Sequence, residues 1–181
     1  MLDGLGRFME KEIAPMSPRF DSHETGIEHA RAALFSKGIT QIAYPAKYGG
    51  LGLPFGVYEL AMELVGTADA SIALSVAIHN TVSEGLFHFG SDALKDAFLP
   101  DIISGKKVAS FSLTEPTSGS DAKAMGTKAK RSGNEYLLNG SKSFITNAGE
   151  ADVYFVFAAT ERGPPRLWWK RRAPASTSVP T

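Results

Sequence analysis

The spacing of apolar residues changes near Gly105, and no other feature limits the possible folds as strongly. Before this point, apolar residues recur every three or four positions, which is the period of an α-helix. After it, apolar and polar residues alternate over short runs, which is typical of β-strands. The sequence therefore predicts an α+β fold, with an N-terminal helical domain over residues 1–105 and an antiparallel β domain over residues 106–161.

Proline, glycine and serine mark the expected ends of the helices. Residues 44–54 hold two prolines and three glycines, so we interpret them as a loop before a helix that starts at Pro54. Residues 69–87 predict a more buried helix, in which we expect structural or surface roles for His79 and Asn80. The other expected boundaries are Gly38 after a helix at 26–37, Gly90 after 69–87, and Ser91 before a helix that runs to Gly105.

Five short runs are expected to be strands. Lysine alternates with small residues at 127–131, which favours an edge strand with one solvated face. Asn139-Gly140 lies between two of the runs, and this residue pair is the strongest short signal for a β-hairpin. We therefore expect a hairpin at Asn139-Gly140. The expected strands are 108–113, 127–131, 135–138, 142–145 and 152–159.

The composition excludes several classes of function. Nineteen basic residues balance nineteen acidic ones, which excludes a polycationic nucleic-acid binder. The absence of cysteine excludes disulfides, thiolate metal sites and a thiol nucleophile, and the four histidines have no spacing typical of a metal site. The longest apolar run, 153–159, is far shorter than the ~18 residues of a membrane span. The N-terminus lacks a signal-peptide pattern, so we expect a cytoplasmic protein without a membrane or nucleic-acid partner.

Two segments rich in hydroxyl groups and glycine are the candidates for chemistry. In residues 111–121 a strand leads into a turn that can present amides and hydroxyls to a ligand with many acceptors. In residues 139–149 an aromatic residue, Phe144, stands near a threonine, a combination that suits a flat heteroaromatic ring with polar edges. Taken separately, each segment is better explained as an ordinary turn, and Phe144 is compatible with a core position.

Three motifs, in this order along the chain, resemble the acyl-CoA dehydrogenase family. The first is Tyr44-Pro45-Ala46-Lys47-Tyr48-Gly49-Gly50-Leu51-Gly52, the loop between early helices in that family. The second is Leu113-Thr114-Glu115-Pro116 followed by Gly119-Ser120-Asp121. The third is Asn139-Gly140-Ser141-Lys142 followed by Phe144-Ile145-Thr146-Asn147. The resemblance covers nearly all of residues 10–160, and three ordered motifs around the change from helix to strand make it specific.

The resemblance implies that FAD is the cofactor and assigns eight residues to it. It places a strand beside the flavin ring, a turn at the FAD diphosphate and at the acyl-CoA, and a third segment over the opposite side of the ring. The family often has tryptophan where Phe144 stands, and phenylalanine keeps the aromatic plane but loses an N–H donor. The strand residues are Phe111, Leu113 and Thr114, the turn residues are Gly119 and Ser120, with Ser120 also binding substrate, and the third segment is Phe144, Ile145 and Thr146.

The resemblance also implies the reaction, which forms a 2,3-enoyl-CoA from an acyl-CoA. A carboxylate removes the proton next to the thioester carbonyl, hydrogen-bond donors stabilise the developing charge, and a hydride passes to FAD. In the family the base is a glutamate on a C-terminal four-helix bundle that also builds a homotetramer. We expect the chain to be truncated before this bundle, without a catalytic residue of its own and inactive alone. Neither Glu115 nor Glu150 is expected to be the base, and the family's usual electron acceptor is an electron-transfer flavoprotein.

The last segment, residues 162–181, differs from the rest and is expected to be irregular. It holds four of the ten prolines and both tryptophans, and Pro164-Pro165 is expected to break the preceding strand. We hypothesise that residues after about Gly163 are read in a shifted frame; the alternative is a genuine basic tail with Arg166, Lys170, Arg171 and Arg172. Two other functional interpretations remain open: a non-catalytic flavin- or acyl-CoA-binding module, and a fragment that folds partly and aggregates.

Overall fold

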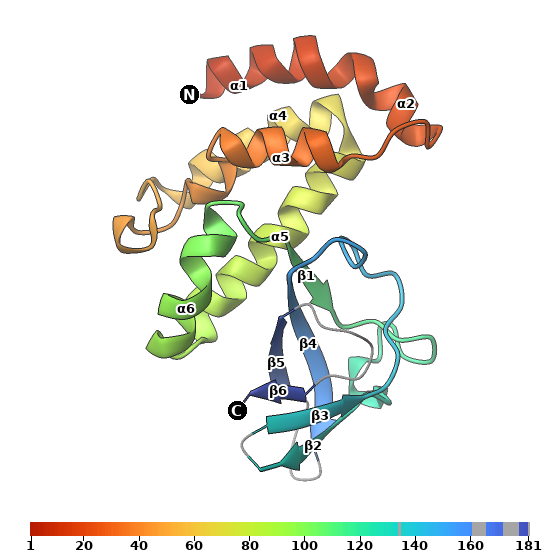
Figure 1. Cartoon of the computed structure of the whole chain (residues 1–181). Coiled ribbons are helices and arrows are strands. Elements are labelled where there is room, and N and C mark those ends of the chain that lie inside the picture. Colours follow the sequence, from red (N-terminus) through yellow and green to blue (C-terminus); the bar gives the residue numbers. More distant parts are fainter. Residues whose placement is uncertain (134, 161–165, 172–177, 181) are drawn as a thin grey trace. The chain divides into compact units, whose positions relative to one another are not determined.

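The chain forms a helical unit followed by a β unit, as the change of hydrophobic period predicts (Figure 1). The computed structural model describes residues 1–133, 135–160, 166–171 and 178–180, with side chains as far as residue 160. Two compact units are present, Met1–Lys106 and Lys107–Thr181. The expected class, a helical domain followed by a small sheet, is therefore confirmed.

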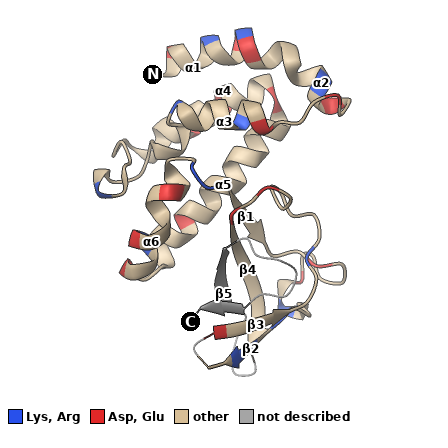
Figure 2. Cartoon of the chain, viewed as in Figure 1, with Lys and Arg blue, Asp and Glu red and all other residues tan. Residues whose placement is uncertain are grey.

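The helical unit contains six α-helices and several short turns of helix within its described residues. Acidic and basic residues alternate along its first helices (Figure 2), in keeping with the balanced composition of the chain. The α-helices are α1 (Leu2–Phe8), α2 (Ser17–Asp21), α3 (Glu28–Ser36), α4 (Phe55–Ala68), α5 (Ala70–Phe89) and α6 (Asp92–Ile103). A π-helical stretch at Met9–Ile13 and 3-10 turns at Ala14–Met16, Ile39–Gln41 and Ala46–Tyr48 connect them.

Residues at the helix ends explain where the helices begin and end. Asp69 accepts a hydrogen bond from the Ile72 amide at the start of α5, at 2.9 Å, and its other carboxylate oxygen accepts one from the Ser17 hydroxyl at 2.6 Å. Ser91 caps α6 as predicted, with its hydroxyl accepting from the Leu94 amide at 3.4 Å. Gly38 follows α3 with a φ of 78°, a left-handed conformation that glycine adopts without steric cost.

Helix α5 is more buried than the preceding helix α4, as predicted. Its inward face is fully covered, and its polar residues there have partners. The Nε2 atom of His79 lies 3.0 Å from the Ile102 carbonyl oxygen, and the Tyr44 hydroxyl donates to the Asn80 side-chain oxygen at 2.9 Å. His79 and Asn80 therefore have structural roles. The apolar residues of α5 with no exposed surface are Ile72, Val76, Val82 and Leu86.

The β unit is a sheet of six strands in the order β1-β4-β2-β3-β6, with β5 also paired to β4. Strand β4 is central because it pairs with β1, β2 and β5. One of its faces contributes Val156 and Ala158 to a cluster with Ala129 of β2. The strands are β1 (Ala109–Ser112), β2 (Lys128–Ser132), β3 (Glu135–Asn139), β4 (Val153–Thr160), β5 (Arg166–Arg171) and β6 (Ser178–Pro180).

The sheet is mixed, which corrects the expectation of a wholly antiparallel domain. Strand β4 runs parallel to β1 and also to β2, whereas β2 and β3 form an antiparallel pair. Parallel neighbours need a long connection, and residues 113–152 supply one between β1 and β4. The alternation of apolar residues along each strand predicts that a strand exists but not which neighbour it pairs with.

Residues 142–145 do not form the expected strand, and Asn139-Gly140 does not turn a hairpin. The hydrogen-bonding groups of this segment are used elsewhere, because the Ser143 amide donates to the Thr114 carbonyl oxygen at 2.9 Å. Gly140 instead permits a close approach of two segments. A β-carbon at Gly140 would lie 2.6 Å from the Thr127 Cα atom, a separation that real side chains do not adopt.

The region expected to be irregular, 162–181, contains two strands. Strand β5 pairs antiparallel with β4 from Ala158↔Arg166 to Val153↔Arg171, and β6 pairs antiparallel with β3. The tryptophans at 168 and 169 favour an extended backbone, so the basic residues around them do not prevent a strand. The expected break at Pro164-Pro165 lies outside the described residues, and the shifted reading frame stays a hypothesis.

Candidate functional site

The candidate site is built around a buried carboxylate that follows β1. Glu115 and Ser118 close a tight turn through two backbone hydrogen bonds, at 2.9 and 3.2 Å. The Glu115 side chain points inward, where its carboxylate accepts from the amides of Gly126 and Thr127 at 2.5 and 3.0 Å. The Lys142 ammonium group donates to the same carboxylate at 2.8 Å. One acidic side chain therefore joins three separate parts of the β unit.

The surroundings of Glu115 decide its charge. Burial alone would raise the pKa of this carboxyl, but the hydrogen bonds from Lys142, Thr127 and Gly126 outweigh burial and lower the pKa from 4.5 to about 2. Glu115 is therefore an ionised carboxylate at neutral pH. Because its oxygens are already occupied by donors, it is suited to holding structure and not to accepting a proton from a substrate.

Lys142 connects the two segments that the sequence marks as candidates for chemistry. Its ammonium group donates to the Leu113 carbonyl oxygen at 2.9 Å as well as to Glu115. The side chains of Lys142 and Glu115 are 11% and 4% exposed, so the ion pair is shielded from water. Together with the bond from the Ser143 amide to the Thr114 carbonyl oxygen, Lys142 fastens residues 142–143 to residues 113–115.

Phe144 follows this attachment and lies almost entirely in solvent. It is 96% exposed, and its backbone has a φ of 56°, a left-handed conformation that is strained for a bulky residue. This exposure excludes a core position for Phe144 in the chain. Backbone strain in proteins often concentrates at binding and catalytic sites, so the exposed and strained Phe144 makes this segment a candidate for ligand binding.

The turn after Phe144 is fastened to β1. The Ser110 hydroxyl donates to the Thr146 carbonyl oxygen at 2.7 Å, and the Asn147 side-chain amide donates to the Ala109 carbonyl oxygen at 3.2 Å. Asn147 also has a positive φ, 65°. The segment 144–145 is therefore held between two attachments, one at 142–143 and one at 146–147.

The eight residues assigned to FAD are only partly brought together. Leu113 and Thr114 adjoin the third segment through the hydrogen bonds of Lys142 and Ser143. The Phe111 ring packs on β4, with its centroid 5.6 Å from Phe155 and 5.3 Å from Phe157. Leu113, Thr114, Ile145 and Thr146 are half-buried, whereas Gly119 and Ser120 are exposed beyond the turn that Glu115 and Ser118 close.

The sequence motifs contain Glu115, Lys142 and Asn147, but the sequence alone predicted no role in the site for them. The signal for Lys142 and Glu115 was a basic and an acidic residue in separate motifs, since charges are buried only when they are paired. Thr127 was missed altogether as a site residue. Its hydroxyl is buried and has no hydrogen-bond partner among the described residues, and it faces the Gly140 backbone.

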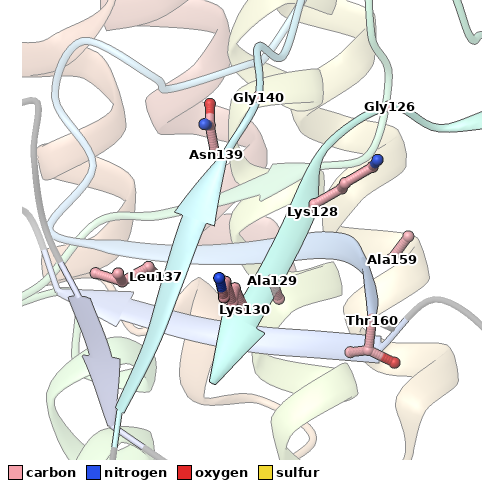
Figure 3. Close-up of a pocket in the computed structure, with 9 residues that line it drawn as sticks. All are labelled: Gly126, Lys128, Ala129, Lys130, Leu137, Asn139, Gly140, Ala159 and Thr160. Carbon is pink, nitrogen blue, oxygen red and sulfur yellow. The ribbon is translucent and has the colours of Figure 1, made fainter. Parts of the chain in front are cut away.

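A cavity in the described part of the β unit is lined by none of the eight residues assigned to FAD. It has a volume of about 710 Å³ and lies beside β2, β3 and the end of β4 (Figure 3). Its lining residues are Gly126, Lys128, Ala129, Lys130, Leu137, Asn139, Gly140, Ala159 and Thr160.

Over residues 1–133 and 135–160, no three histidine, aspartate or glutamate side chains converge in an arrangement that could hold a metal ion. None of the described helices combines the length and the apolar character needed to cross a bilayer.

Comparison with known proteins agrees with the motifs. Residues 1–106 match the model of the acyl-CoA dehydrogenase N-terminal domain, and residues 110–174 match that of the middle domain. An acyl-CoA dehydrogenase of Bacillus subtilis is 36% identical over 154 residues, which are 84% of this chain and 41% of that protein. The chain thus spans about two fifths of the length of this curated relative.

Solved structures share the fold. Butyryl-CoA dehydrogenase from Megasphaera elsdenii is 33% identical with a TM-score of 0.91, covering 96% of this chain and 48% of its own. A glutaryl-CoA dehydrogenase from Mycobacterium smegmatis in complex with FADH2 is 27% identical with a TM-score of 0.85, covering 94% of this chain and 44% of its own. Because both family models match and together cover most of its residues, this chain belongs to the acyl-CoA dehydrogenase family.

Proposed function

We propose that this chain binds FAD, with the flavin ring against residues 113–114 and 144–146, as part of a flavin-dependent acyl-CoA dehydrogenase. The observation that carries the proposal is Phe144, which is 96% exposed with a φ of 56°. A solvated aromatic side chain in a strained conformation has no role in the packing of the chain itself. It is suited to covering the flat ring of a ligand.

The neighbouring groups fit the polar parts of FAD. Thr114 and Thr146 are half-buried threonines whose hydroxyls suit the polar edge of a flavin ring. Gly119 and Ser120 are exposed, and they would offer backbone amides and a hydroxyl to the diphosphate. A β-carbon at Gly119 would meet no atom within 4 Å, so the backbone there is open to a ligand.

FAD, when bound, supplies the hydride acceptor for forming a 2,3-enoyl-CoA. The chain's own residues would position the ring and exclude water from its covered side. We propose that the base that removes the substrate proton is not Glu115, whose carboxylate is held by Lys142 and two backbone amides. It would come from residues beyond this chain, in line with the two fifths of a relative that the chain spans.

The remaining elements of the proposal rest on the family resemblance. They are an acyl-CoA substrate that contacts Ser120, an electron-transfer flavoprotein as electron acceptor, assembly of the complete enzyme as a homotetramer, and a cytoplasmic location. Without the base, the chain by itself would be a flavin-binding module that does not turn over acyl-CoA.

A titration with FAD tests the proposal. We expect retention of FAD by the chain on gel filtration in a one-to-one ratio. The variant Phe144→Ala should weaken binding by about tenfold or more, while Phe89→Ala, which removes a phenylalanine that is 81% exposed in the helical unit, should leave it unchanged. Equal binding by both variants, or loss of FAD by the unaltered chain, contradicts the proposal. Turnover of acyl-CoA with an artificial electron acceptor would contradict the placement of the base.

A further inference from the structure

Two attachments hold the segment 144–145, which contains the exposed Phe144, and they differ in kind. The attachment at 146–147 consists of neutral hydrogen bonds to β1, from Ser110 and Asn147. The attachment at 142–143 contains a buried ion pair, between Lys142 and Glu115, and it precedes Phe144 by two residues. Hydrogen bonds between charged groups are shorter and stronger than neutral ones, so the attachment at 142–143 restricts the segment more.

The Lys142 ammonium group forms hydrogen bonds with the residues on both sides of Thr114. It donates to the carbonyl oxygen of Leu113 at 2.9 Å and to the carboxylate of Glu115 at 2.8 Å. The Ser143 amide donates to the carbonyl oxygen of Thr114 itself. Three consecutive residues of the first segment are therefore fixed by two consecutive residues of the second.

Glu115 is in turn fixed from a third direction. The amides of Gly126 and Thr127, at the start of β2, donate to its carboxylate. The anchor for Lys142 cannot move unless these bonds break. The low pKa of Glu115, about 2, means that the anchor keeps its charge throughout the neutral range.

We propose that Lys142 is a positioning residue for flavin binding: its ammonium group holds Phe144 and Thr146 at a fixed distance from Leu113 and Thr114. This inference rests on the proposed function, and it adds a residue that does not itself touch the ligand. A site that accepts a flat ring between two segments needs their spacing fixed before the ligand arrives, because ordering them on binding costs affinity.

The test compares four variants of the chain. Lys142→Met removes the charge but keeps most of the length of the side chain, and Lys142→Arg keeps a donor of the same charge. The double variant Glu115→Gln with Lys142→Met removes both charges, so no uncompensated charge is buried. Lys130→Met, at an exposed lysine of β2, is the matched control.

Two readouts are measured on each variant. The first, without ligand, is the strong NOE between the amide and Hα protons of Phe144 that a positive φ produces, recorded on the 15N-labelled chain. The second is the dissociation constant for FAD. Thermal unfolding is followed in parallel, to identify variants that lose the fold.

Positioning predicts a specific pattern. Lys142→Met and the double variant should both lose the positive-φ signal and bind FAD about tenfold or more weakly, although the double variant should unfold at a higher temperature than Lys142→Met. Lys142→Arg should retain part of both signals, and Lys130→Met should retain both. If the double variant regains FAD affinity together with stability, Lys142 serves only to neutralise Glu115 and the inference is overturned.

Failure of the inference can be told from failure of the proposed function. If the unaltered chain does not bind FAD, the proposed function fails for this chain, while the NOE of Phe144 still decides whether Lys142 positions the segment. If the chain binds FAD and Lys142→Met keeps both the NOE and the affinity, the proposed function stands and the positioning role is wrong.

Discussion

The ammonium group of Lys142 lies 2.8 Å from the carboxylate of Glu115, and both side chains are shielded from water. Burying two charges costs desolvation energy, which is recovered only when the geometry is good and the remaining polar atoms are satisfied. Here the Gly126 and Thr127 amides and the Leu113 carbonyl oxygen satisfy them. The pair therefore stabilises the β unit at neutral pH, and this stabilisation should be lost in acid.

Acid should destabilise the β unit through Glu115. The pKa of this carboxyl is about 2 in the folded chain and 4.5 when unperturbed, so the unfolded chain binds its proton first as the pH falls. The stabilisation is complete above pH 4.5 and is lost between pH 4.5 and 2, with a total of about 3 kcal/mol. Urea unfolding at a series of pH values measures the loss.

The variant Glu115→Gln provides the control for this pH dependence. It should be less stable than the unaltered chain at pH 7 and should show a smaller change between pH 4.5 and 2. An equally steep change in Glu115→Gln would assign the acid sensitivity to other carboxyls.

A second pH effect should arise in the helical unit from His79. Burial lowers the pKa of this imidazole to about 4, the Ile102 carbonyl opposes the shift, and the charge of Arg31 adds to it. The folded chain keeps His79 neutral while the unfolded chain becomes protonated below pH 6.5, so stability should fall between pH 6.5 and 4 by about 3 kcal/mol. NMR titration of the His79 ring protons checks the folded pKa, and the exposed-site variant His88→Gln should leave that titration unchanged. A midpoint near 6.5 for His79 would contradict the prediction.

Replacing Gly140 by alanine should destabilise the β unit. The new β-carbon would lie 2.6 Å from the Thr127 Cα atom, and Gly140 has a φ of 157°. Because two backbone segments would have to move apart, we expect a loss of about 1–3 kcal/mol in the free energy of unfolding. Gly149→Ala is the matched control, since a β-carbon there would meet no atom within 4 Å. Equal unfolding temperatures for the two variants would show that the approach of Gly140 to Thr127 is not tight.

Replacing Phe144 by glycine should stabilise the chain while weakening FAD binding. Glycine adopts a φ of 56° without strain, and an exposed phenylalanine contributes little packing that could be lost. We expect a gain of about 1 kcal/mol in the free energy of unfolding, measured in urea. Destabilisation by Phe144→Gly would mean that the ring packs against the protein and is not free to cover a ligand.

The helical unit could be predicted from the sequence more completely than the sheet. The sequence correctly predicts the helix boundaries at Gly38, Gly90 and Ser91, because a cap depends on residues within one turn of the helix end. The partners of β4 could not be predicted, since strand pairing depends on residues far apart in the chain. The prediction of a strand at 142–145 is wrong for the same reason, because Lys142 and Ser143 form hydrogen bonds with residues about thirty positions earlier in the sequence.

The candidate site, too, could be predicted from the sequence only in part. The motifs selected the segments around Thr114 and Phe144, and the structure joins these segments directly by hydrogen bonds. What the sequence could not supply was the exposure of Phe144 and the inward direction of Glu115. Both depend on the packing of the whole β unit and not on the local alternation of polar and apolar residues.

The parallel pairing of β1 with β4 has a consequence for the order in which the chain acquires its structure. The two strands are separated by all of residues 113–152, so their pairing must close a long loop before any of its hydrogen bonds form. In the helical unit, α4 packs on α5 and α5 on α6, which are neighbours along the chain. Contacts between sequence neighbours form faster than distant ones, so the helices should reach their native arrangement while the sheet is still assembling.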